Sequence, residues 1–377
     1  MSNRIERYKR AKKERLEGKF NGAPLFYSFP RLGQYVPIIP RGKQIMTLGG
    51  SGTGKSQSWI GLCILPVYNL IRNYNYKAKF HIFLLEDPKE LFEDRLFSRV
   101  LYLKSGKKLS VDPIELNSMR ETPLSDEVES LLEEVDGVVE DILSYCVVYD
   151  SVYHATGIYK NLRTESSKAG EHIWETRDFT YKKQDGSIHK EPTKVYKEYI
   201  PKDPELHNIV IVDNLNNLSE ENEHDKNGKF IKRLSIREAI TRWTRDYARL
   251  QIVKHWNWTV WNIMQTALEA DRKQFDLMRG KQVIEKVEPN LSSLGDNKIC
   301  ARDQHLILGL FNPDRFNIED YEGYDITKLE DSFRSLIILK SNFSITNKKV
   351  PLYFNGACSY YEELPSYKDI KYDKFKN

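Results

Sequence analysis

Residues 40–56 read PRGKQIMTLGGSGTGKS, and this stretch decides the fold. The apolar run IMTL at 45–48 ends at glycines, as a buried strand does before a turn. The next stretch, SWIGLCILPVYNLI at 58–71, is long and apolar enough for a mostly buried helix. The order is therefore strand, loop, helix, and GGSGTGKS at 49–56 fits the phosphate-loop pattern GxxxxGKS.

The residues of this loop predict a site for ATP and Mg²⁺. Glycines at 49 and 54 let the backbone turn its N–H groups inward around a β-phosphate, at the positive end of the following helix. Lys55 is placed to neutralise β- and γ-oxygens, and Ser56 to offer a hydroxyl to Mg²⁺. We expect nucleotide contacts from the whole loop: Gly49, Gly50, Ser51, Gly52, Thr53, Gly54, Lys55 and Ser56.

Further apolar runs predict an open, mostly parallel sheet. Buried strands are expected within residues 79–88, 146–150, 208–214 and 259–266, with helical patterns between them. Three strand-like segments with short connections follow at 304–311, 334–342 and 350–356. The fold class is therefore α/β, with helices on both faces of the sheet and an antiparallel C-terminal edge.

Polar residues end three of these strands and are candidates for chemistry. Asp213 follows the apolar run IVIV and is placed to hold Mg²⁺ through water, although it could instead cap the next turn. Glu86 closes FHIFLL and is a candidate to orient the attacking water, with a helix-start carboxylate as the alternative. Gln265 closes VWNIM and is either a γ-phosphate sensor or an ordinary polar strand end.

Composition narrows the class only in part. The chain has 58 Lys or Arg against 54 Asp or Glu, so its net charge of +4 does not by itself indicate nucleic acid. Residues 1–20 contain eight of the Lys and Arg residues and three Glu, which fits a solvated helix or a phosphate-backbone contact. The four scattered cysteines indicate neither a zinc site nor a disulfide framework. With no signal peptide and no long apolar span, a cytoplasmic protein without a membrane anchor is expected.

Four stretches together resemble a known family. PRGKQIMTLGGSGTGKS, FLLEDPKELFEDRL, NIVIVDNLNNL and NIMQTALEADR are similar to the motor domain of DnaB-type (superfamily 4) replicative helicases, which are RecA-like P-loop ATPases. The resemblance covers about residues 30–362. It implies that Glu86, Lys55 and Gln265 are the catalytic residues, that Arg95 follows Glu86 on a helix, and that Asp213 is the magnesium carboxylate.

The sequence departs from the family at two places. The closing Lys-x-Arg motif, which reaches into a neighbouring subunit, reads Lys340-Ser341-Asn342, so the lysine is a trans-acting candidate and the finger arginine is missing. Arg334 and Arg302 are the candidates to replace it. About 45 residues precede the phosphate loop, so we expect a motor domain at 30–362, a basic arm at 1–29 and a polar tail at 363–377, with no collar domain.

The family's DNA-binding loops follow the strands that end at Asp213 and Gln265. Here those loops are long, and their bases suit backbone binding; the DNA-binding candidates are Lys226, Lys229, Lys232, Arg233, Arg272, Lys273, Arg279 and Lys281. Ordinary solvated loops are the alternative, because Glu220, Glu221 and Glu223 dilute the first loop. For the tryptophans Trp256, Trp258 and Trp261, core packing is favoured over base stacking.

Residues 176–200 predict a β-hairpin around Asp185-Gly186, which is either a decorative insertion or a contact for a partner or for nucleic acid. For the whole chain we expect an oligomeric, Mg²⁺-ATP-driven motor on single-stranded DNA, a hexameric ring or filament with a replication or recombination partner protein. Richness in Lys, Asn and Tyr suggests a phage or plasmid origin. The alternatives are a recombinase or KaiC-like regulatory ATPase without unwinding activity, and a DNA-packaging ATPase.

Overall fold

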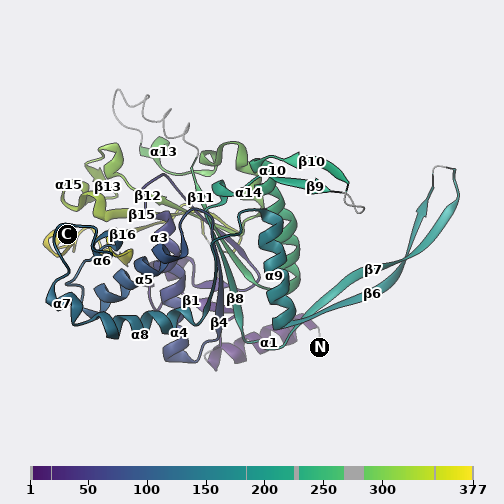
Figure 1. The fold of residues 1–377 in the computed structure, drawn as a ribbon, viewed down its shortest axis with the longest axis horizontal. Helices are drawn as coiled ribbons and strands as arrows, with labels where there is room; N and C mark the ends of the chain where they lie inside the picture. Colours follow the sequence, from purple (N-terminus) through teal and green to yellow (C-terminus); the bar gives the residue numbers. More distant parts are fainter. Residues whose placement is uncertain are drawn as a thin grey trace.

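The computed structural model describes residues 3–17, 19–183, 185–224, 229–266, 284–343 and 345–375. Within them, a nine-stranded sheet runs in the order β17-β16-β15-β12-β3-β11-β8-β4-β5 (Figure 1). The strands from β12 to β5 are parallel: β12 Leu306–Phe311, β3 Gln44–Gly49, β11 Thr259–Gln265, β8 His207–Asp213, β4 Ala78–Leu84 and β5 Cys146–Tyr149. The antiparallel edge consists of β15 Phe333–Ser341, β16 Lys349–Asn355 and β17 Tyr360–Glu363. The predicted fold class is confirmed.

Alternating side chains of the central strands feed two separate cores. On β8, Ile209 and Ile211 pack on one face of the sheet, while Val210 and Val212 pack on the other. The first face is covered by a helix that is continuous from α3 through a π-helical segment into α4, and by α5 and α8; their bounds are α3 Lys55–Trp59, η1 Ile60–Ile64, α4 Leu65–Tyr74, α5 Lys89–Lys104 and α8 Leu132–Leu143. The second face is covered by α9 Ala155–Ala169, α10 Ile236–Thr241, η3 Arg242–Val253, α11 Lys254–Trp256 and α14 Lys298–Asp303.

The chain ends are shorter extensions than the sequence predicts. Helix α1 (Asn3–Leu16) is exposed along its length, but Ala23, Leu25 and Phe29 are buried in the core of the sheet. At the other end, Leu364 and Phe375 are buried against the antiparallel edge. The packed body therefore begins near β1 and continues beyond residue 363, because apolar side chains in both predicted extensions find core partners.

Small elements complete the described chain. The N-terminal part contains β1 Gly22–Pro24, α2 Pro30–Tyr35 and β2 Ile38–Pro40, and one end of the body contains α6 Pro113–Leu116 and α7 Asp126–Glu129. The C-terminal part adds α13 Ile284–Val287, η4 Leu291–Asn297, η5 Asp314–Phe316, β13 Asp320–Tyr321, β14 Tyr324–Asp325, α15 Ile326–Leu329, η6 Glu330–Ser332 and η7 Tyr372–Phe375. No helix in the described part of the chain combines the length and apolar character that a membrane crossing requires.

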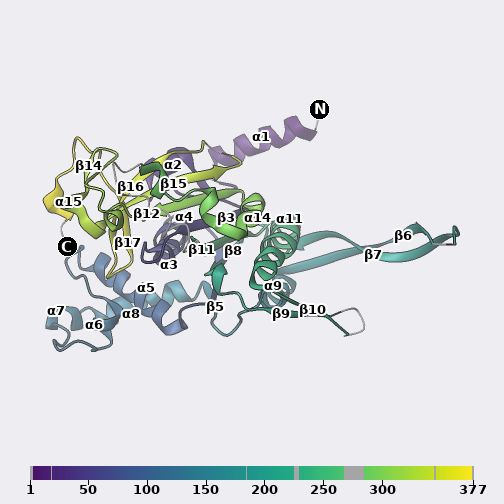
Figure 2. The same cartoon turned by 90° about the horizontal axis from the view of Figure 1, so that it is seen from above.

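Two hairpins leave the body on the same side (Figures 1 and 2). Strands β6 (Gly170–Lys182) and β7 (Ile188–Pro201) form a long arm, so the predicted hairpin exists and begins six residues earlier than expected. Gly186, at φ +85°, takes the left-handed conformation that its turn requires. The shorter hairpin, β9 (Glu221–His224) with β10 (Phe230–Leu234), follows β8 where an irregular loop was expected.

Candidate functional site

The glycine-rich loop lies between β3 and α3, at the carboxyl edge of the parallel strands. Gly52 and Gly54 have φ angles of +67° and +87°, which side chains with a Cβ rarely adopt. The Thr53 hydroxyl donates to the Gly50 carbonyl at 2.9 Å, closing the loop on itself. Lys55 is 7% exposed, and its Nζ lies 3.5 Å from the same carbonyl. The sequence therefore folds into a turn whose lysine is directed back over the loop.

The antiparallel edge supports this loop from behind. Arg334 on β15 donates from Nε to the Thr53 carbonyl at 2.8 Å, and Tyr361 on β17 donates its hydroxyl to the Gly54 carbonyl at 2.8 Å. Arg334 is 0% exposed, and its guanidinium lies over the Phe354 ring. The prediction that Arg334 replaces the finger arginine is therefore wrong, because this buried side chain binds the loop of its own subunit.

Asp213 is the carboxylate that meets the loop. Its Oδ1 accepts from the Ser56 hydroxyl at 3.2 Å, and its Oδ2 accepts from the indole Nε1 of Trp59 at 2.8 Å. Trp59 is 2% exposed and packs on Phe92 with ring centroids 5.2 Å apart. Burial raises the pKa of Asp213 to about 6, although the bonds from Trp59 and Ser56 oppose that rise. The indole thus occupies one oxygen and leaves the other facing Ser56.

Glu86 lies beside Asp213 on the neighbouring strand. Leu84 pairs with Asp213 in the parallel ladder, so the chain after β4 runs past the end of β8. Asn214 donates from Nδ2 to Glu86 Oε2 at 3.2 Å, and the Glu86 side chain is exposed at the sheet edge. Arg95 on α5 forms an ion pair with Asp87 and not with Glu86. Water can therefore reach the Glu86 carboxylate, and the Asn214 amide fixes its position.

Gln265 ends β11, the strand that lies between β3 and the Asp213 strand β8. It pairs with Gly49 in the β11–β3 ladder, so its side chain starts next to the first residue of the glycine-rich loop. Its backbone N–H donates to Asn216 Oδ1 at 2.9 Å, which joins the turn after β8 to the end of β11. The predicted residues Lys55, Ser56, Asp213, Glu86 and Gln265 are thus gathered along one edge of the sheet.

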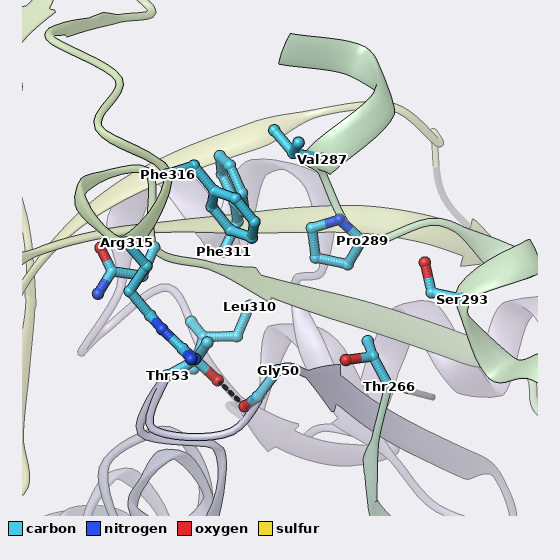
Figure 3. Close-up of a pocket in the computed structure, with 11 residues that line it drawn as sticks. Gly50, Thr53, Thr266, Val287, Pro289, Ser293, Leu310, Phe311, Arg315 and Phe316 are labelled. Atoms are coloured by element: carbon cyan, nitrogen blue, oxygen red, sulfur yellow. Dashed lines mark hydrogen bonds between the residues drawn. The ribbon is translucent and has the colours of Figure 1, made fainter. Parts of the chain in front are cut away.

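A cavity of about 100 Å³ opens beside the loop (Figure 3). It lies between the loop, the end of β11 and the end of β12, and Gly50, Thr53 and Thr266 form one wall. Phe311 and Phe316 form the apolar wall, their rings stacked with centroids 5.6 Å apart. In Figure 3, the exposed Arg315 side chain extends from the far wall toward Thr53. No signal in the sequence points to this cavity.

Solved structures share the arrangement of these strands and helices. The solved structure titled "ATPase Domain of G40P" superposes with a TM-score of 0.63 at 15% identity, over 97% of this chain and 100% of that one. A DnaB-like replicative helicase, described with its interactions with primase, gives 0.63 at 15% identity over 96% of this chain. The chain has the fold of a RecA-like helicase ATPase domain. It spans 66% of the length of the second protein, and its sequence matches no family model and no curated protein.

In this RecA-like domain, Lys340 lies at the edge of the sheet opposite the loop. Its ammonium donates to the carbonyls of Ala301 and Gln304 at 2.8 and 2.7 Å, and to that of Arg302 at 3.2 Å. Lys340 therefore caps the C-terminus of α14 in its own subunit, and a trans-acting role would first need these bonds to break. Arg302 itself is exposed beside them.

The candidate DNA contacts divide into two groups. Lys226 and the second-loop residues Arg272, Lys273, Arg279 and Lys281 lie outside the described residues. Lys229 is exposed and directly precedes β10, the second strand of the β9–β10 hairpin. Lys232 binds Glu238 at 2.6 Å and Arg233 binds Glu220 at 2.7 Å, so neither is the unpaired cation that the sequence suggests. Both ion pairs are exposed, and such pairs are worth at most about 1 kcal/mol.

The tryptophans behave as core residues, as predicted. Trp256, Trp258 and Trp261 are each at most 3% exposed, and the Trp261 indole donates to the Thr47 hydroxyl at 3.0 Å. Base stacking by these rings is excluded. The tryptophan that matters for the site is Trp59, one helical turn after Lys55, which the apolar helix pattern does not distinguish from its neighbours.

Proposed function

We propose that this protein is an oligomeric Mg²⁺-ATP-driven motor on single-stranded DNA, a replicative-type helicase or translocase. The observation that carries the proposal is the single sheet edge on which the glycine-rich loop, the Ser56–Asp213 pair and Glu86 meet. A loop with a lysine and a hydroxyl binds phosphates and Mg²⁺, and two carboxylates on adjacent strands separate metal binding from water activation. A phosphate-binding protein without turnover has no use for the second carboxylate.

The residues fit Mg²⁺-ATP. A Cβ at Gly54 would lie 2.3 Å from the Tyr361 hydroxyl, so the loop is built to keep its backbone N–H groups open. Lys55 would supply the positive charge for the phosphates, and Ser56 and Asp213, whose side chains meet at 3.2 Å, would hold the Mg²⁺. Bound Mg²⁺-ATP supplies the γ-phosphoryl group and the divalent charge for the reaction.

The protein residues then divide the work of hydrolysis. Glu86 accepts a hydrogen bond from the attacking water and orients it, while the Asn214 amide holds the carboxylate in place. Lys55 stabilises negative charge that develops on the phosphate oxygens. The amide of Gln265, which pairs with Gly49 in the β11–β3 ladder, responds to whether a γ-phosphate is present.

The same residues connect the nucleotide to the proposed DNA contacts. Asn214 and Asn216 lie in the turn between β8 and the β9–β10 hairpin, and they contact Glu86 and Gln265. A change at either strand end is therefore passed to the hairpin that carries Lys229, Lys232 and Arg233. The exposed ion pairs of Lys232 and Arg233 exchange readily for DNA phosphates. We place the protein in the cytoplasm, in a phage or plasmid replication system.

A strand-displacement assay tests this proposal. We expect hydrolysis of ATP that single-stranded DNA stimulates, together with unwinding of a forked duplex. One observation favours the alternative of a RecA- or KaiC-like ATPase: Asn342 replaces the finger arginine, and Arg334 is buried in its own subunit. Stimulated hydrolysis without displacement would support that alternative and refute the helicase. Stimulation by duplex DNA alone would indicate a packaging motor instead.

A further inference from the structure

The β6–β7 arm is the largest feature that the proposed ATPase chemistry does not use. It extends from the body as an isolated two-stranded ribbon (Figures 1 and 2). Thirteen residues in β6, at about 3.3 Å per residue, give a length of about 40 Å. A two-stranded ribbon with both faces in water is only marginally stable by itself. An arm of this length therefore requires a surface to lie on.

The pairing register gives the distal arm two different faces. Paired residues share a face, so Lys194 lies with Thr176, Lys190 with Thr180, and Lys182 with Ile188. We call Lys182, Lys190 and Lys194 the lysine face; all three are exposed and have no ion pair within the described residues. Its single acid is Asp178. The lysine face is thus a line of cations along the outer arm.

The opposite face of the arm is apolar. Phe179, Tyr181 and Val195 are 61%, 36% and 37% exposed. The charged residues of this face are Arg177 and Glu175, which form an ion pair, and Glu191, which pairs with Phe179 across the two strands. Exposed aromatic side chains near a rim of charge are typical of protein–protein contacts.

The total charge of the arm disfavours nucleic acid as its partner. Residues 170–201 carry six Lys or Arg and six Asp or Glu, so the arm is neutral overall. Segments that bind a polyanion carry a net positive charge. A neutral arm with segregated lysines instead fits a protein surface that has acids in one place and apolar groups beside them.

The chain itself presents such a surface at its other end. Residues 121–141, which include α7 and most of α8, contain nine Asp or Glu and no Lys or Arg. Seven are exposed and have no ion pair within the described residues, and we call them the acidic end: Glu121, Asp126, Glu127, Glu129, Glu133, Asp136 and Glu140. In the segment that directly precedes the acidic end, Ile114 and Met119 are 52% and 74% exposed. The carboxylates therefore complement the lysine face, and these two side chains complement Ile188, which shares that face and is 74% exposed.

The arm and the acidic end lie at opposite ends of the long axis of the molecule (Figures 1 and 2). Two complementary patches at opposite ends cannot meet within one copy. They meet when copies associate head to tail, an arrangement that closes as a ring or continues as a filament.

We propose that the arm of one copy docks on the acidic end of the next, with the lysine face against the carboxylates. The proposal rests on the oligomer that forms part of the proposed function, and it names the contact that joins the subunits. Because the contact joins lysines to carboxylates at the protein surface, association weakens as the salt concentration increases.

Charge reversal tests the contact in the full chain. One variant carries Lys182→Glu, Lys190→Glu and Lys194→Glu; the second carries Glu127→Lys, Glu129→Lys and Glu133→Lys. Sedimentation velocity with Mg²⁺ and a non-hydrolysable ATP analogue measures assembly. We expect each variant alone to raise the apparent dissociation constant about tenfold or more. An equimolar mixture of the two should assemble again, because each reversed patch then meets a reversed partner.

Two controls keep the test decisive. Reversal at Lys160, Lys348 and Lys371 changes charge equally on other exposed surfaces and should leave assembly unchanged. Replacing residues 176–194 by Asn-Gly should prevent assembly while circular dichroism shows a folded body.

Wild-type-like assembly of both reversal variants, a mixture that stays dissociated, or a wild-type chain that remains monomeric overturns the proposal. Reduced DNA affinity with unchanged assembly makes the arm a nucleic-acid contact instead. Failure of the proposed motor is read separately, from ATP hydrolysis and strand displacement.

Discussion

Replacing Trp59 by Phe should move the pH dependence of ATP hydrolysis to higher pH. The substitution keeps a buried ring against Phe92 but removes the 2.8 Å hydrogen bond to Asp213 Oδ2. A hydrogen bond to a charged group contributes about 1.5–3 kcal/mol. At about 1.4 kcal/mol per pKa unit, its loss raises the pKa of Asp213 by about one to two units.

That increase matters because the pKa of Asp213 is already about 6. At pH 7 the wild-type carboxylate is about 90% ionised, and an increase of one unit leaves it about half ionised. Only the ionised form attracts Mg²⁺. The variant should therefore need more Mg²⁺ for half-maximal activity at pH 7, and the difference should disappear by about pH 9, where both proteins are ionised.

The assay is a Mg²⁺ titration of ATP hydrolysis at several pH values between 6 and 9. Trp243→Phe is the matched control, since Trp243 is equally buried and donates at 2.8 Å to the neutral Asn262 amide oxygen, away from the loop. It should lose stability without any shift in pH profile. If Trp59→Phe and wild type have the same Mg²⁺ requirement at every pH, the indole does not control Asp213 and the reasoning fails.

Three further predictions concern the site and the candidate DNA-binding loop at residues 272–281. Glu86→Gln should bind a fluorescent ATP analogue normally but lose at least about 100-fold in turnover, as expected for a general base; normal turnover would assign that role elsewhere. Asp213→Asn should abolish Mg²⁺-dependent hydrolysis yet stabilise the nucleotide-free protein at pH 7. The sign follows from burial, which raises the pKa from 3.8 to about 6: the folded state binds the extra proton, so wild-type stability decreases as pH rises through that window, by up to about 3 kcal/mol. Urea unfolding at pH 4 and pH 7 measures this, and an equal gap between the proteins at both pH values would contradict it. Neutralising Arg272, Lys273, Arg279 and Lys281 together should weaken the binding of single-stranded DNA and flatten its salt dependence. If the affinity is unchanged at 50 and 200 mM salt, these residues do not bind DNA.

The parallel core was predictable because its determinants are local. The strand that ends at Asp213 is apolar at successive positions, which only a strand covered on both faces requires. Asp213, Glu86 and Gln265 directly follow apolar runs, and Lys55 and Ser56 directly follow the glycine-rich loop. Parallel strands bring such positions to one edge, so their juxtaposition needed no knowledge of side-chain packing.

Contacts between distant segments were not predictable in the same way. The Trp59 indole reaches Asp213 across 154 positions of sequence, and Arg334 reaches the Thr53 carbonyl across 281. Arg334 was a candidate for the finger arginine, and its complete burial could not be expected because arginine is rarely fully buried unless it is paired. The ion pairs of Lys232 and Arg233 were missed because the hairpin that places them contains mixed charges and no apolar alternation.

Strand β15 has a mechanical consequence for the missing finger arginine. Arg334, near its start, holds the glycine-rich loop, and Lys340, six positions later, holds the far end of α14. The two side chains are about 20 Å apart along β15, which pairs with β12 on both sides of a bulge between Ile338 and Lys340. We expect a push on the Lys340 end of β15 to displace the carbonyl at Thr53, so that a neighbouring molecule could alter the geometry of this loop without inserting any side chain into it.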